Sequence, residues 1–249
     1  MCIRDSQNYC QKFVKNARST KVFTIDNLMK AYIITIIKNS DSLDYAETCL
    51  KSIKDTDSEL DAQIYLASTP ESMFDVNWTW PLDGKKSCTK TNLFLTPYKT
   101  VDNKKRIAAA QSHYRLWKQC IHINEPIMIL EHDALFTRKF VAPNTTDDVG
   151  AYSINDPRGA TFKAKDYHNK LTEGLNEVPW VTKDQIPQGM PGHSAYVIKP
   201  WAAKDVVNKQ NEIGWWPNDA IMCKQICPWV RVYKPYFTTT QGIKSTTSK

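Results

Sequence analysis

Two carboxylates follow directly on a strongly apolar run of the chain. Residues 127–130 are Ile, Met, Ile and Leu, which is typical of a strand buried on both faces, and Glu131, His132 and Asp133 come next. If the strand continues through them, Glu131 and Asp133 leave the same face and His132 points away. Hard carboxylate oxygens at the carboxyl end of a parallel strand suit Mg2+ or Mn2+, which keep positions open for phosphate oxygens. The alternative for an isolated Glu-x-Asp is the start of a polar loop.

The residues before this run predict a parallel sheet. Residues 31–37 are typical of a short buried strand, and residues 61–67 are typical of a second strand. Between them, residues 43–53 place apolar side chains at helical spacing, so the unit is β-α-β with a right-handed crossover. A further helix from residue 104 to residue 121 leads to the strand at 127. The expected fold class is therefore α/β, with a mostly parallel sheet flanked by helices.

The second half of the chain is less regular. Its patterns predict strands at 151–154, 192–198 and 230–233, and helices at 200–207 and 220–227. Residues 68–100 are expected to form an irregular loop region at the ligand edge of the sheet, and residues 155–190 a polar insertion.

Composition and charge narrow the function class less than the carboxylates do. The 249 residues include 33 Lys and Arg against 26 acids, and the net charge of +7 favours polyanionic partners such as nucleic acid, nucleotides or an acidic membrane surface. No apolar run approaches the roughly 18 to 20 residues of a membrane-spanning helix, and no secretory leader is recognisable, so a cytoplasmic protein is expected. Residues 1–28 are polar and are expected to form a peripheral leader.

The seven cysteines are predicted to be reduced thiols, because they lack the paired C-x-x-C spacing of a zinc site. Cys223 and Cys227 are one helical turn apart, and two half-buried helix residues are favoured over a metal site.

Segments in order along the chain resemble glycosyltransferase family 25. Residues 106–117 (RIAAAQSHYRLW) and 129–134 (ILEHDA) resemble the family's Ser-His helix and its Leu-Glu-Asp-Asp signature. Three later segments are similar to its Gly-x-x-Ala-Tyr segment, its Pro-Val-Asp and its closing Gln-x-x-x-Ser-Thr-Ile; they are residues 192–203 (GHSAYVIKPWAA), 216–219 (WPND) and 241–247 (QGIKSTT). His132 replaces the middle acid of the signature, and residues 109–111 (AAQ) replace a Gly-Cys, departures that concern the sugar donor more than the reaction class.

The resemblance implies a GT-A-like nucleotide-sugar-binding domain over residues 29–249, with a UDP-sugar as the most expected donor. Asp133 would bind Mn2+ or Mg2+ directly, and Glu131 would assist it or orient the ribose. Asp219 would be the general base near the acceptor, although an N-cap of the following helix is an equally good explanation of its position.

Three further residues are assigned to the donor pocket by the same resemblance, each with a structural alternative. His193 would be a metal ligand or contact the diphosphate, and the alternative is a buried, hydrogen-bonded imidazole. Ser112 and His113 would line the donor pocket, and the alternative is that they pack inside the helix.

The acceptor is left open by the sequence. One candidate is a hydroxymethylated pyrimidine in DNA, as in some viruses, with basic clusters on the phosphates and Trp215 or Trp216 stacking on an extruded base. Another is a surface glycan. Trp78 and Trp80 could likewise stack on a base or sugar, or pin their loop to the core. Two alternatives belong to other function classes. One is a non-catalytic glycan-binding module, which the retained acids disfavour. The other is a metal-dependent phosphatase or nuclease, which would need more clustered acids.

Overall fold

The computed structural model describes residues 28–100, 102–159, 163–190 and 193–242. At its centre is a seven-stranded sheet with the order β2-β1-β5-β9-β7-β10-β8. The pairs β1–β2, β1–β5 and β10–β7 are parallel, and β9 and β8 are antiparallel to their neighbours, so five of the seven strands run in one direction. The predicted α/β class with a mostly parallel sheet is confirmed. The seven strands are β1 (Met29–Thr35), β2 (Leu60–Leu66), β5 (Ile127–Glu131), β7 (Ala151–Ser153), β8 (Gly174–Glu177), β9 (Ala195–Ile198) and β10 (Val230–Lys234).

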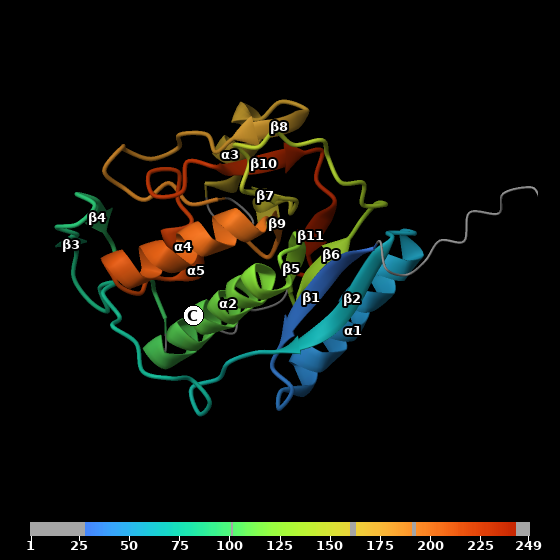
Figure 1. Cartoon of the computed structure of the whole chain (residues 1–249), viewed down its shortest axis with the longest axis horizontal. Helices are drawn as coiled ribbons and strands as arrows, with labels where there is room; N and C mark the ends of the chain where they lie inside the picture. Colours follow the sequence, from blue (N-terminus) through green and yellow to red (C-terminus); the bar gives the residue numbers. More distant parts are fainter. Residues whose placement is uncertain (1–27, 101, 160–162, 191–192, 243–249) are drawn as a thin grey trace, which may run out of the picture.

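Helices cover both faces of the sheet (Figure 1). Helix α2 (Asn103–Ile123) and helix α4 (Pro200–Ile213) pack together over one face, where their apolar side chains meet those of β1, β5 and β9. Helix α1 (Ser40–Asp55) covers the other face beside β1 and β2, together with a two-stranded ribbon of β6 (Ala134–Phe136) and β11 (Thr238–Thr240). Alternate residues of β1 and β5 serve the two layers, which explains their unbroken apolar sequences.

The helix starts follow from local sequence. The Asn39 side chain caps α1 by accepting a hydrogen bond from Ser42 N at 3.0 Å, and Asp102 caps α2 by accepting from Lys104 N at 2.8 Å. Helix α4 begins at Pro200, whose missing N–H costs nothing at that position. None of the described helices is long and apolar enough to cross a membrane.

Three predicted elements differ in the structure. The strand at 127 does not continue through Asp133: β5 ends at Glu131, residues 132–133 form a turn, and β6 belongs to the ribbon. Residues 155–190 are not uniformly irregular, because they contain the 3-10 turn η2 (Pro157–Gly159), helix α3 (Ala164–Lys170) and strand β8.

The helix predicted at 220–227 is also wrong, since α5 (Asn218–Ile221) lasts four residues. The backbone after it pairs with the loop before β9 instead: Gly189 forms a bridge with Cys223, and Lys224 N donates to Gln188 O at 2.9 Å. Tertiary pairing thus overrides the helical pattern. Cys223 and Cys227 are fully buried free thiols.

Segment 68–100 is irregular, as predicted, apart from the short hairpin of β3 (Lys86–Ser87) and β4 (Phe94–Leu95). Trp80 packs against Trp216 and Tyr98, with ring centroids 5.3 and 5.4 Å apart, and Trp78 forms a bridge with Trp215. These tryptophans therefore pin the loop to the core.

Candidate active site

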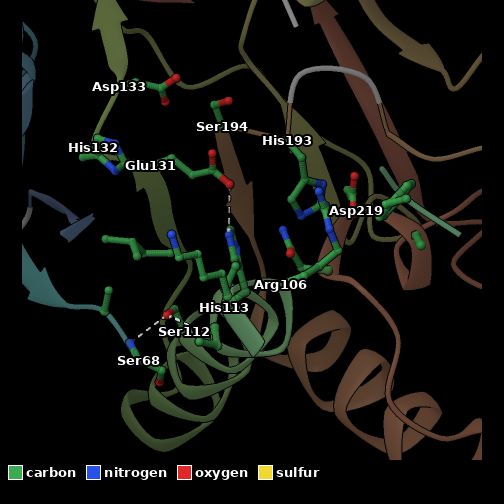
Figure 2. Close-up of a pocket in the computed structure, with 18 of the residues that line it drawn as sticks. Ser68, Arg106, Ser112, His113, Glu131, His132, Asp133, His193, Ser194 and Asp219 are labelled. Carbon is green, nitrogen blue, oxygen red and sulfur yellow. Dashed lines mark hydrogen bonds and ion pairs between the residues drawn. The ribbon is translucent and has the colours of Figure 1, made fainter. Parts of the chain in front are cut away.

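The carboxyl ends of β1 and β5 open into a cavity of about 1500 Å3. Strand β1 lies between β2 and β5. The connection after β1 leads to β2 on one side of it, and the chain later returns to β5 on the other side. This reversal of strand order is a topological switch point, the place where open α/β sheets bind ligands. All six predicted site residues line this cavity, and Figure 2 shows them around it: Ser112, His113, Glu131, Asp133, His193 and Asp219.

Glu131 is held by His113 from helix α2. The His113 Nε2 atom lies 3.4 Å from Glu131 Oε1, and the Nδ1 atom lies 2.9 Å from the Tyr196 hydroxyl of β9. Burial alone would raise the pKa of Glu131, but the hydrogen bond from His113 brings that pKa below its usual value. Glu131 is therefore an ionised carboxylate in the wall of the cavity.

Asp133 lies in the turn between β5 and β6, and one of its carboxylate oxygens, Oδ1, is buried without a hydrogen-bond partner among the described residues. Burial, with the charge of Glu131, raises the Asp133 pKa to about 7. The side chain of Gln241 fixes this turn by donating to the carbonyls of Tyr45, His132 and Ala134. Gln241 was not among the predicted site residues, although it begins one of the segments that resemble the family.

The turn also changes the expected position of His132. Because the strand stops at Glu131, the alternation of faces does not reach His132, and this residue borders the same cavity. Its ring centroid lies 6.3 Å from that of Tyr45, and burial lowers its pKa.

Asp219 stands on the opposite side of the cavity, in the first turn of α5. The N-cap of that helix is Pro217, so the capping alternative for Asp219 is wrong. Burial raises the Asp219 pKa, while the positive charge of Arg106 opposes this and the Tyr98 hydroxyl hydrogen-bonds to the carboxylate. The Arg106 guanidinium stacks 4.4 Å from the centre of the Tyr98 ring. Sequence reasoning missed Tyr98, which lies in the irregular loop, and passed over Arg106 at the start of the Ser-His helix.

His193 is buried, at 8% exposure, but it is not the hydrogen-bonded imidazole of the structural alternative. Neither ring nitrogen has a hydrogen-bond partner within the described part of the chain. Its ring lies 4.5 Å from Tyr196 and 5.4 Å from His113. Burial lowers the His193 pKa to about 3, so the imidazole is neutral. A neutral imidazole whose two nitrogens have no hydrogen-bond partner in the described residues can donate a hydrogen bond to a ligand from one nitrogen and accept one at the other.

Ser112 has a structural task. Its Oγ atom accepts from Ser68 N at 2.9 Å and donates to Ala108 O at 3.0 Å, which ties the end of β2 to helix α2 (Figure 2). The residue lines the cavity, but its hydroxyl is already engaged.

Trp215 and Trp216 do not stack on an extruded base. Trp216 is fully buried and donates from Nε1 to Thr79 Oγ1 at 3.0 Å, while Trp215 is 7% exposed and packs against Tyr114. This part of the DNA hypothesis is wrong.

The carboxylates are the groups that could hold a cation. In the described ranges, no three His, Cys, Asp or Glu side chains are arranged to hold a metal ion. The unpartnered oxygen of Asp133 and the ionised Glu131 nevertheless offer the one or two hard oxygen ligands that Mg2+ or Mn2+ takes when substrate phosphates complete its coordination. The carboxylate oxygens thus fit a divalent cation of this kind.

Comparison with known proteins finds one family that is similar to this chain. The model of glycosyltransferase family 25 (LPS biosynthesis protein) matches residues 103–222, a range that includes every predicted site residue. No curated protein sequence matches the chain. A glycosyltransferase involved in glycosylation of the major capsid of PBCV-1 is similar in structure over 87% of this chain and 94% of its own, at 9% identity and a TM-score of 0.41.

A second solved structure, the bifunctional glycosyltransferase WbbM in its apo form, is similar over 84% of this chain and 39% of its own, at 11% identity and a TM-score of 0.40. The match of the family model confirms the resemblance drawn from the sequence. Residues 103–222 match the model of glycosyltransferase family 25, and the protein is a glycosyltransferase.

Proposed function

We propose that this enzyme moves a sugar from a nucleotide-diphosphate sugar to a hydroxyl of a glycan in a metal-dependent reaction. The observation that carries the proposal is the placement of Glu131 and Asp133 on one side of a single cavity, at the switch point of the sheet, with Asp219 on the other side. Three carboxylates at these places meet the two requirements of the reaction, a stabilised diphosphate and a deprotonated acceptor.

The donor would occupy the crevice between β1 and β5. Its nucleoside would lie toward the ends of β1 and β2, where Asn39, Thr69 and Glu71 line the cavity, and its diphosphate would lie beside Glu131 and Asp133. A UDP-sugar is the donor that the family resemblance favours. The polar side chains at this end would read the base and ribose through hydrogen bonds.

Asp133, with Glu131, would hold Mn2+ or Mg2+. The cation would supply positive charge to the diphosphate as it leaves. Asp133 is suited to this place because its buried oxygen has no partner among the described residues, and a cation would relieve the cost of ionising it.

Asp219 would act as general base at the acceptor. In an inverting transfer, the acceptor oxygen forms a bond to the anomeric carbon, its proton passes to the Asp219 carboxylate, and the bond from that carbon to the diphosphate oxygen breaks. The raised pKa of Asp219 strengthens it as a base. His193 would bind a sugar hydroxyl or a diphosphate oxygen through its neutral ring.

A glycan acceptor is favoured over DNA by the charges of the molecule. Five acids and three bases line the cavity: Glu71, Asp102, Glu131, Asp133 and Asp219 against Lys38, Lys105 and Arg106. Residues 1–27 and 243–249 hold seven Lys and Arg and two acids, so they carry +5 of the net charge of +7. The cavity and the described surface therefore lack the strong positive field that phosphate binding in DNA would use.

The test is an acceptor comparison read by product mass. The enzyme, a panel of UDP- and GDP-sugars and Mn2+ would be incubated with either a lipooligosaccharide core or DNA that contains hydroxymethylcytosine. A hexose or pentose added to the core would support the proposal. Addition to the DNA alone would reject the glycan acceptor, and Asp133→Asn protein serves as the control for both. A cytoplasmic location stays a prediction, which cell fractionation would test.

A further inference from the structure

A line of hydrogen-bonding side chains leads from the packed interior to Glu131. Trp117 Nε1 of helix α2 donates to the Tyr196 hydroxyl at 2.9 Å, and the same hydroxyl lies 2.9 Å from His113 Nδ1. On the far side of its ring, His113 Nε2 lies 3.4 Å from Glu131 Oε1. Trp117 and Tyr196 are fully buried, and His113 is 2% exposed, so water does not compete for these bonds.

The indole of Trp117 determines which atom donates and which accepts in each of these hydrogen bonds. An indole N–H can only donate, so the Tyr196 oxygen must accept from Trp117. The single hydroxyl proton of Tyr196 then has His113 Nδ1 as its partner, which makes Nδ1 an acceptor. A neutral imidazole with an accepting Nδ1 carries its proton on Nε2, and that proton faces Glu131.

The opposite arrangement leaves a buried group without a partner. If His113 carried a proton on Nδ1, the Tyr196 oxygen would accept from both Trp117 and His113, and its own proton would have no acceptor in the described network. An unsatisfied buried hydroxyl costs about 1–3 kcal/mol. The packing around Tyr196 therefore disfavours a proton on His113 Nδ1.

We propose that Tyr196 and Trp117 are positioning residues that set the tautomer of His113 and, through it, the orientation of the Glu131 carboxylate. His113 holds one oxygen of Glu131 by a neutral Nε2–H donor, and the full negative charge and the second oxygen stay available to the donor complex. The positioning role rests on the proposed function, but the tautomer does not.

The tautomer is tested by NMR of the imidazole nitrogens in uniformly 15N-labelled protein. The chain has five histidines, and the His113 signals are assigned by their absence in His113→Asn. The wild-type protein is expected to show an unprotonated, hydrogen-bonded Nδ1 and a protonated Nε2. In Tyr196→Phe, Nδ1 loses its donor and its resonance is expected to shift. A wild-type His113 that carries its proton on Nδ1, or that is doubly protonated, would overturn the proposal.

Activity tests the positioning role. Partners that orient a ligand-binding side chain typically contribute about 10–100-fold to affinity or activity, so Tyr196→Phe is expected to lower the kcat/KM of Mn2+-dependent donor turnover by that factor. Tyr152→Phe is the matched control, because Tyr152 is 4% exposed on the neighbouring strand β7 and borders neither the cavity nor the hydrogen-bonded line.

If Tyr196→Phe loses no more activity than Tyr152→Phe, the positioning role is rejected. Trp117→Phe provides a second variant in case Tyr196→Phe folds poorly. This change removes the indole donor to the Tyr196 oxygen and leaves the Tyr196 hydroxyl proton in place. The preference of His113 for a proton on Nε2 is expected to weaken in the same spectrum, and an unchanged spectrum would count against the proposal. Failure of the proposed function would look different: wild-type enzyme would turn over no nucleotide sugar, whereas the NMR result would stand by itself.

Discussion

Adding one methyl group at Gly189 tests whether the position of Asp219 matters for catalysis. Gly189 lines the cavity, and a Cβ atom built on it lies 2.6 Å from the backbone carbonyl oxygen of Asp219. Ordinary contact begins at 3.4 Å, so Gly189→Ala must move the two segments apart by about 0.8 Å. The backbone at Gly189 is expected to move little, because the Gly189 carbonyl oxygen accepts a hydrogen bond from the Tyr167 hydroxyl at 3.1 Å.

Displacements of about 1 Å in a catalytic group cost on the order of 100-fold in rate. Gly189→Ala is therefore expected to lower kcat by roughly 10- to 100-fold while the affinity for the nucleotide sugar, whose proposed binding groups lie across the cavity, stays near the wild-type value. The assay is Mn2+-dependent transfer, with kcat and donor KM measured separately and donor affinity measured by calorimetry.

The control is a clash elsewhere whose closest distance is the same. A Cβ atom at Gly150 lies 2.6 Å from Ala202 Cβ, and Gly150 does not line the cavity. Overpacking costs about 1–3 kcal/mol in the free energy of unfolding, so both variants lose stability, but only Gly189→Ala should lose kcat when rates are expressed per folded molecule. A folded Gly189→Ala enzyme with the wild-type kcat would refute the placement of Asp219 at the reacting hydroxyl.

Three further outcomes are expected. Asp219→Asn should lower kcat by about 100- to 10,000-fold with donor affinity retained in calorimetry, and lost donor affinity would give Asp219 a different role. Without metal, Asp133 binds its proton more tightly in the folded than in the unfolded protein. Protonation of Asp133 therefore stabilises the folded protein below the usual pKa of 3.8, and this stabilisation is lost as pH rises toward about 7. Thermal melts from pH 4 to 7 without metal should therefore show a flatter Tm for Asp133→Asn than for wild type, and parallel curves would contradict the raised pKa. Gly214→Ala should lower the free energy of unfolding by about 1–3 kcal/mol in urea titrations, because Gly214 has a φ of +105° and its Cβ would lie within 2.5 Å of Thr79; an unchanged midpoint would contradict this.

Local hydrophobic patterns were sufficient to predict the strands and the helix that form the central crevice. The apolar runs of β1 and β5 and the helical spacing of α2 are set by burial alone, so their periodicity is legible in the sequence. The same patterns fail at residues 220–227, where pairing with Gly189 and Gln188 ends the helix, and at 132–133, where the chain turns into a separate ribbon. These contacts join segments that are remote in sequence, and no local preference encodes them.

The candidate site divides in the same way. Residue types and order were enough to name Glu131, Asp133 and Asp219, and the structure places all three around one cavity. The partners that set their ionisation were not predictable, because Tyr196 meets His113 across 83 residues and Tyr98 reaches Asp219 from an irregular loop. Such partners are specified by tertiary packing between segments that are remote in sequence.

The measurement that tests the central claim most directly is nucleotide-diphosphate release from a panel of UDP- and GDP-sugars, with Mn2+ and with EDTA. Wild-type enzyme is expected to release the nucleotide diphosphate from at least one donor with Mn2+, to stop when EDTA is added, and to lose the activity in Asp133→Asn. Release that is equally fast with EDTA, or in Asp133→Asn, would contradict the metal-binding role of the carboxylate pair. No release from any donor, with or without acceptor, would contradict the account of the cavity as a sugar-transfer site.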